Sequence, residues 1–130
     1  MRGWLRNFSL LVYAVVIATL GACDQTQPVS TLPSSMVLEH YAKAGDLIWS
    51  KEIGDKDQLY AKLTRLVVDD RRAWSPNITT YVPGPYIFRS EHLIIMCFSD
   101  RLVMDVDDSG KWRSYSRKEN ALEEFELSPQ

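Results

Sequence analysis

The chain has 130 residues, 45% of them hydrophobic, and its 15 basic and 17 acidic side chains leave a formal charge of −2. A chain of this length folds as one domain at most. The basic residues form no cluster that would suit a phosphate backbone, so we expect no nucleic-acid partner.

The first 22 residues have the form of an export signal. Arg2 and Arg6 precede a stretch that carries no charge as far as Ala22. A basic start, a short apolar run and small residues at its end are typical of a signal peptide. The apolar run from residue 8 to residue 20 is shorter than the roughly 20 residues that span a bilayer. A helix of the folded core is the alternative interpretation of this run. The run lacks the polar face of such a helix, and a polar linker follows it.

The apolar run ends in Leu20-Gly21-Ala22-Cys23. An aliphatic residue, two small residues and a cysteine resemble the lipobox of bacterial lipoproteins. The resemblance implies cleavage between Ala22 and Cys23, a diacylglycerol on the Cys23 sulfur and an N-acyl lipid on its new amino group. Asp24 resembles the residue that retains lipoproteins of enteric bacteria in the inner membrane. We therefore expect a chain anchored to the cell membrane by lipid and facing the periplasm, without any other cofactor. An ordinary signal peptide with a chance cysteine is the alternative.

The mature chain after Ala22 would keep 13 basic and all 17 acidic side chains, which gives a charge of −4. Residues 24–35 are polar, contain two prolines and lack periodicity, so residues 23–35 are predicted to be the lipidated cysteine and a tether. Residues 36–130 are predicted to form the domain. Cys97 would then have no cysteine to pair with, which excludes an internal disulfide.

We expect one or two helices in the first half of the domain. Residues 36–44 can place three of their apolar side chains on one side of a short helix, and residues 47–49 fit either a strand or a helix. The strongest helix prediction is residues 55–69, with Asp55 as N-cap and Gln58 three residues later. Its apolar stripe consists of Leu59, Leu63, Leu66 and Val67.

The second half predicts an antiparallel meander of four to five strands and a short C-terminal helix, so the fold class is expected to be α+β. Residues 92–98 are apolar on both alternating faces, which is typical of a central strand covered on both sides. Residues 82–85 suit a type II turn, because proline precedes glycine there. Residues 116–119 fit a capping box ahead of a helix that includes Phe125. The expected strands are residues 78–82, 86–89, 92–98, 101–107 and 111–115.

One stretch resembles half of a calcium-binding loop. Asp105, Asp107 and Ser109 supply oxygens at the first, third and fifth positions, and Gly110 stands at the sixth. The twelfth position is Ser116, where such a loop needs a bidentate glutamate, and the flanks are predicted strands. We therefore expect a polar turn that binds no metal.

Catalytic groups are sparse. His92 and Cys97 differ by five positions, so they would point to opposite faces of one strand, and we expect Cys97 to be a small core residue. The chain contains no nucleophile elbow, metalloprotease motif or phosphate loop. We therefore expect no catalytic residue and no enzyme activity.

Aromatic residues gather near the predicted turns, and arginines accompany them. Both types are enriched at binding hot spots. The residues predicted to bind a protein partner are Tyr81, Tyr86, Arg89, Trp112 and Arg113.

Two functional hypotheses follow. The first is a non-enzymatic lipoprotein that binds an envelope protein, as an immunity-type inhibitor or an assembly accessory would. The second is a small periplasmic hydrolase or ligand-binding protein that uses carboxylates, His40 or His92.

Overall fold

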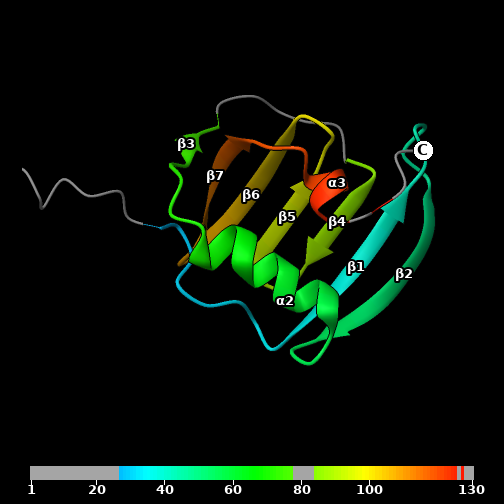
Figure 1. Ribbon diagram of the computed structural model, residues 1–130, viewed down its shortest axis with the longest axis horizontal. Coiled ribbons are helices and arrows are strands. Elements are labelled where there is room, and N and C mark those ends of the chain that lie inside the picture. Colours follow the sequence, from blue (N-terminus) through cyan, green and yellow to red (C-terminus); the bar gives the residue numbers. More distant parts are fainter. Residues whose placement is uncertain (1–26, 78–83, 126, 128–130) are drawn as a thin grey trace, which may run out of the picture.

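The computed structural model describes residues 27–77, 84–125 and 127. They form a seven-stranded sheet in the order β2-β1-β4-β5-β6-β7-β3, in which neighbouring strands are antiparallel (Figure 1). A helix composed of α2 (Gln58–Thr64) and the π-helical turn η1 (Arg65–Asp69) lies across one face, and the short α3 (Ala121–Glu124) covers the same face. The strands are β1 (Ser35–Tyr41), β2 (Leu47–Gly54), β3 (Ser75–Pro76), β4 (Tyr86–Arg89), β5 (Leu93–Cys97), β6 (Arg101–Asp108) and β7 (Lys111–Lys118).

The predicted α+β arrangement with one or two N-terminal helices is wrong. Over the described residues, the sheet has seven strands, and the helices are one of 12 residues and one of four. Residues 36–44, expected to be helical, contain most of β1. Met36, Leu38 and His40 are buried in alternation, which is the period of a strand. A polar histidine at the third buried position conceals this alternation in the sequence.

Residues 47–49, which fit either a strand or a helix in the sequence, begin strand β2, and its burial explains the ambiguity. Seven of its eight residues are exposed, and Ile53 alone is buried, so no alternation marks the segment. Pairing with β1 places Ile53 opposite Met36 and Trp49 opposite His40. The register shifts by one residue between His40 and Tyr41, which is a β-bulge of the kind common at sheet edges.

The helix prediction for residues 55–69 holds except at its start. The N-cap is Asp57, not Asp55, and its Oδ1 accepts a hydrogen bond from the Leu59 amide at 2.9 Å. The apolar stripe faces the core as predicted, with Leu59 partly buried and three members buried: Leu63, Leu66 and Val67.

The strands β4 to β7 confirm the predicted meander, and β5 is the middle strand of the sheet. β7 continues to Lys118, so the predicted capping box at residues 116–119 is wrong. Helix α3 is instead capped by Asn120, whose Oδ1 accepts a hydrogen bond from the Glu123 amide at 3.1 Å. The expected strand at residues 78–82 lies outside the described residues, as does the first half of the turn at residues 82–85. Gly84 is buried where a Cβ atom would lie 3.0 Å from the Cys97 carbonyl oxygen.

The core lies between the helices and one face of the sheet. Leu63 and Val67 close it from the helix side. Phe125, just after α3, tilts against Phe88 with ring centroids 5.3 Å apart. One row that crosses four strands has no exposed surface: Leu38, Phe88, Ile95 and Met104.

The N-terminal strap, defined here as residues 27–34, lies against the domain although the sequence predicts a free tether there. Val29 and Leu32 pack against the core. The Tyr60 hydroxyl donates to the Leu32 carbonyl at 3.2 Å, and the Gln27 side-chain amide donates to the Asp70 carbonyl at 2.9 Å. The folded unit therefore includes residues from Gln27 onward, nine positions earlier than the predicted boundary at residue 36.

Candidate functional site

The exposed large hydrophobic side chains gather at one edge of the sheet. Among the described residues, five such side chains are exposed, and four of them belong to the β1–β2 hairpin. We call the three of them on β2 the β2 edge: Leu47 (52% exposed), Ile48 (48%) and Trp49 (39%); Val37 (36%) lies on the neighbouring strand β1. The fifth is Trp112 on β7. Clustered exposed hydrophobic residues mark interaction surfaces more often than scattered ones do.

Strand β2 also offers its backbone. It is the outermost strand, and β1 is the only strand paired with it in the described part of the chain (Figure 1). An edge strand carries backbone N–H and C=O groups that can pair with a further strand. Residues 47–50 carry no charge, and the first charged residues of β2 are Lys51 and Glu52. In the apolar half of β2, both the backbone groups of the free edge and the side chains are therefore accessible to a partner.

Buried aromatic rings hold Trp49 in place. The His40 ring lies 5.5 Å from the Trp49 ring and stacks on Tyr86 at 4.3 Å with an interplanar angle of 19°. His40 Nδ1 lies 2.8 Å from the Pro85 carbonyl oxygen, to which it donates a hydrogen bond. An exposed tryptophan supported in this way loses little conformational entropy on binding, which suits a hot-spot residue.

The five residues predicted to bind a partner do not share one face. Tyr86 is 4% exposed and belongs to the core, so the expectation that it is accessible is wrong. Arg89 pairs with Glu39 at 2.6 Å. Trp112 and Arg113 are exposed neighbours on β7, so their side chains point to opposite faces of the sheet. Tyr81 lies outside the described residues.

Trp49 and its neighbours were missed because exposed residues of an edge strand show no periodicity. Their only signal was three large apolar residues in succession, Leu47-Ile48-Trp49, beside the glycine turn at residue 45. This run is too short to reveal an edge strand without knowledge of the sheet order.

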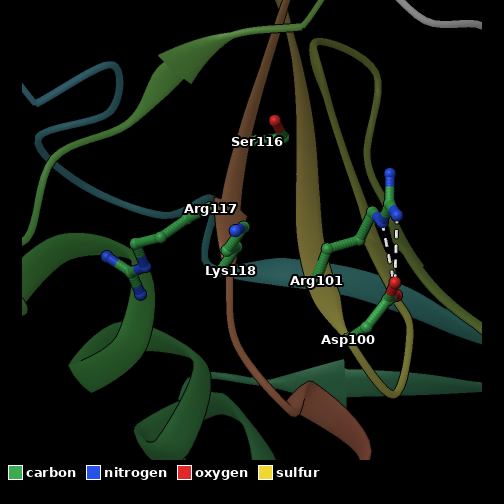
Figure 2. Close-up of a pocket in the computed structure, with 5 residues that line it drawn as sticks. All are labelled: Asp100, Arg101, Ser116, Arg117 and Lys118. Carbon is green, nitrogen blue, oxygen red and sulfur yellow. Dashed lines mark hydrogen bonds and ion pairs between the residues drawn. The ribbon is translucent and has the colours of Figure 1, made fainter.

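A hollow of about 300 Å³ lies on the sheet between β6 and β7 (Figure 2). Arg101 and Lys118 are cross-strand partners there, and Ser116 lies near them. Figure 2 shows the Arg101 guanidinium turned onto Asp100, at 2.9 Å, and the Arg117 side chain turned away toward the helix. The hydrogen bond from Arg101 lowers the pKa of Asp100. The positive charge of Arg101 is thus matched locally, and the hollow does not form an anion site.

Arg117 has a structural role. Its side chain is 5% exposed, and Nη2 donates to the Leu66 carbonyl at 2.7 Å and to Glu119 Oε2 at 2.9 Å. The guanidinium carbon lies 4.6 Å from the centre of the Trp74 ring. Helix-end carbonyls lack intrahelical partners, and arginine satisfies one here. Arg117 therefore ties the end of the helix to β7.

Among the described residues, His92 and Asp107 form the shorter of two histidine–carboxylate pairs, since Glu91 lies 3.8 Å from His92. His92 Nδ1 lies 2.9 Å from Asp107 Oδ2, and Asp107 Oδ1 accepts the Gly110 amide at 2.8 Å. The hydrogen bond that His92 donates to Asp107 raises the pKa of His92. The pair borders a hollow of about 420 Å³ beneath the strap. No nucleophilic side chain is hydrogen-bonded to His92 in the structure as described.

The stretch that resembles a calcium loop forms the end of β6 and a tight turn. Both flanks are strands, and Asp107 uses its oxygens for His92 and Gly110. Within the described residues, no three metal-ligating side chains are grouped. Cys97 is fully buried, as predicted, and burial raises the pKa of its thiol well above the ordinary range.

In the ranges that the structure describes, no helix is both long and apolar enough to cross a membrane. Comparison of the chain with protein-family models, with curated proteins and with solved structures found no match. Function is therefore inferred from the lipobox-like sequence that ends at Cys23 and from the geometry of the β2 edge.

Proposed function

We propose that this protein is a small lipoprotein, anchored by lipid on Cys23 at the periplasmic side of the cell membrane, that binds another envelope protein without catalysing a reaction. The lipobox-like sequence supports the anchor. The β2 edge carries the binding proposal, because three of the five exposed large hydrophobic residues in the described chain lie on β2, the strand at one edge of the sheet.

The partner presents an extended segment that pairs with β2. Backbone hydrogen bonds along an edge strand supply affinity, and side-chain contacts at alternate positions supply specificity. Burial of the apolar surface that Leu47 and Trp49 still expose contributes about 25 cal/mol per Å² removed from water. Inhibition of a toxin and support of an assembly both consist of binding of this kind, so both roles are consistent with the proposal.

The alternative is a periplasmic hydrolase or ligand-binding protein. His40 is buried between aromatic rings and bonded to a backbone carbonyl, so its side chain does not reach solvent. The His92–Asp107 pair would have to act in its place. That pair favours the alternative only if a substrate reaches the hollow beneath the strap.

A pair of tryptophan variants tests the binding surface. Trp49→Ala should weaken capture of the envelope partner by about 30-fold, equivalent to a hot spot of roughly 2 kcal/mol. Trp112→Ala is the matched control, because Trp112 is equally exposed but lies on β7. Affinity is measured with the anchored protein in membranes, and thermal unfolding verifies that both variants fold. Equal affinity of the two variants, or a loss in Trp112→Ala alone, would contradict the proposal.

A further inference from the structure

We infer that the end of the domain around Asp70 and Arg71 rests on the membrane that carries the lipid anchor, in contact with phospholipid headgroups. This inference rests on the proposed lipidation of Cys23. It adds an orientation, because it states which surface of the domain faces the bilayer and which surface faces the periplasm.

The first step is the point where the chain becomes attached to the domain. The Gln27 side chain donates to the Asp70 carbonyl at 2.9 Å, and Val29 and Leu32 pack against the core a few residues later. The strap is thus held from its first residue. Any free tether must lie before Gln27.

The second step is the length of that tether. Cys23 and Gln27 are four residues apart, and four extended residues span at most about 14 Å. The predicted tether of residues 23–35 would have allowed three times as many residues. The polar headgroup layer of each leaflet is about 5 to 8 Å thick. A lipid on Cys23 therefore holds the surface around Gln27 within about one headgroup layer of the bilayer.

The third step is the chemistry of that surface. Arg65 and Arg71 are both exposed beside the attachment point, since Asp70 follows η1 and its amide donates to the Arg65 carbonyl at 2.8 Å. The carboxylate of Asp70 is already paired with Arg72 at 2.6 Å. Guanidinium groups bind phosphate oxygens with two hydrogen bonds. Arg65 and Arg71 are therefore placed to bind lipid phosphates.

The fourth step is the position of the β2 edge. Asp70 lies five residues before β3, which is at one edge of the sheet, whereas β2 is at the other edge. Six strand spacings of about 4.8 Å separate the two edges by about 29 Å. Figure 1 shows the strap entering on the side of β3 and β7, away from β2. The anchor thus presents the β2 edge away from the bilayer, where a partner can reach it.

Depth-dependent quenching tests the orientation. The lipidated chain is reconstituted in vesicles of phosphatidylethanolamine and phosphatidylglycerol that contain a headgroup spin-labelled lipid. A thiol fluorophore is placed at Arg71→Cys or, as the matched control, at the exposed Glu52→Cys on β2. Native Cys97 takes no label because it is fully buried. Quenching at position 71 should be at least about threefold stronger than at position 52. Equal quenching, or stronger quenching at position 52, would overturn the inference.

A longer tether tests whether the short tether, rather than attraction between the domain and the lipid headgroups, holds position 71 near the membrane. Insertion of 12 Gly and Ser residues after Gln25 gives a flexible tether with a root-mean-square reach of about 22 Å. Quenching at position 71 should then fall by at least half, and unchanged quenching would overturn the short tether as the cause.

Incorporation of a fatty-acid analogue, lost in Cys23→Ser, verifies the anchor in the same preparations. A lipidated chain with equal quenching refutes the orientation alone. A wild-type chain that takes up no fatty acid refutes the anchor, and with it both proposals.

Discussion

At the residue scale, the two histidines show how surroundings decide the role of a titratable group. His40 is buried, stacked and bonded to a carbonyl, and it supports Trp49 from below. His92 is exposed, with its ring held by Asp107. The sequence makes both equally plausible as catalytic groups, because a side chain's burial depends on strands that pair with it from elsewhere in the chain.

The pKa of His92 should depend on Asp107. The hydrogen bond that His92 donates to the Asp107 carboxylate raises the pKa of His92 above its ordinary value of 6.5. A raised pKa in the folded state stabilises the protein at pH below 6.5, and this contribution is lost as pH rises through the folded-state pKa. In Asp107→Asn, the pKa of His92 should fall, whereas Glu91→Gln should lower it less because Glu91 lies farther away, at 3.8 Å. Titration followed by NMR measures both. An unchanged pKa in Asp107→Asn would show that the hydrogen bond is absent in solution.

Replacement of the buried Arg117 on β7 should strongly lower the stability of the fold. Arg117→Met leaves the Leu66 carbonyl without a donor, and it removes one ion pair of the Glu119 carboxylate, 4% exposed, whose pair with Arg72 at 2.8 Å stays in place. We expect the free energy of unfolding to fall by about 2 kcal/mol or more. Arg113→Met is the control, since its pair with Asp108 is long, at 3.9 Å, and exposed, and should cost less than about 1 kcal/mol. Urea denaturation compares the two, and equal losses would refute a buried ion pair.

At the element scale, the hairpin between β6 and β7 depends on its turn. Ser109 and Gly110 both have positive φ, 56° and 87°, as a type I′ turn requires. A side chain other than that of glycine is strained at the φ of 87° that Gly110 adopts. The sequence predicted a turn here and the structure confirms it. The sequence did not reveal that Asp107 Oδ1 accepts a hydrogen bond from the Gly110 amide within this turn.

Alanine at the turn glycine should therefore destabilise the hairpin. Gly110→Ala should lower the free energy of unfolding by about 1 to 2 kcal/mol, because alanine is strained in the left-handed region. Gly54→Ala is the matched control, since a Cβ atom there meets nothing within 4 Å and its φ is not positive. It should be neutral or slightly stabilising. The thermal midpoints of the two variants give the comparison, and a loss confined to Gly54→Ala would contradict this account of the turn.

Elements with strong local signals were predicted well. The helix has an apolar stripe at helical spacing, and β6 has apolar residues at alternate positions, of which Leu102 and Met104 are fully buried. The error at the start of the helix arose because Asp55 and Asp57 both suit an N-cap. Strand β2 ends at Gly54 and a turn follows it, so the helix begins later and Asp57 is its N-cap.

At the scale of the whole molecule, the sheet separates two surfaces. The strap joins the domain near β3, and the exposed hydrophobic residues lie on β2 at the opposite edge. This arrangement connects the proposed anchor with the proposed binding surface. Neither surface contains the residues Tyr86 and Arg113, which the sequence assigned to binding on the basis of their proximity to turns.

The sequence by itself determined the features encoded within a few neighbouring residues. These are the amphipathic helix, the antiparallel strands β4 to β7 and the core position of Cys97, whereas the lipobox-like signal stays a prediction. Hydrophobic periodicity, caps and turn residues act over one or two turns of chain, so they can be read without a fold.

Only the tertiary structure decided which strand lies at an edge, which histidine is buried and where the strap attaches. The contacts responsible join distant residues. Arg117 and Leu66 are 51 positions apart, His40 and Pro85 are 45 apart, and Gln27 and Asp70 are 43 apart. Burial and edge exposure are consequences of such pairings, and no local pattern specifies the partner.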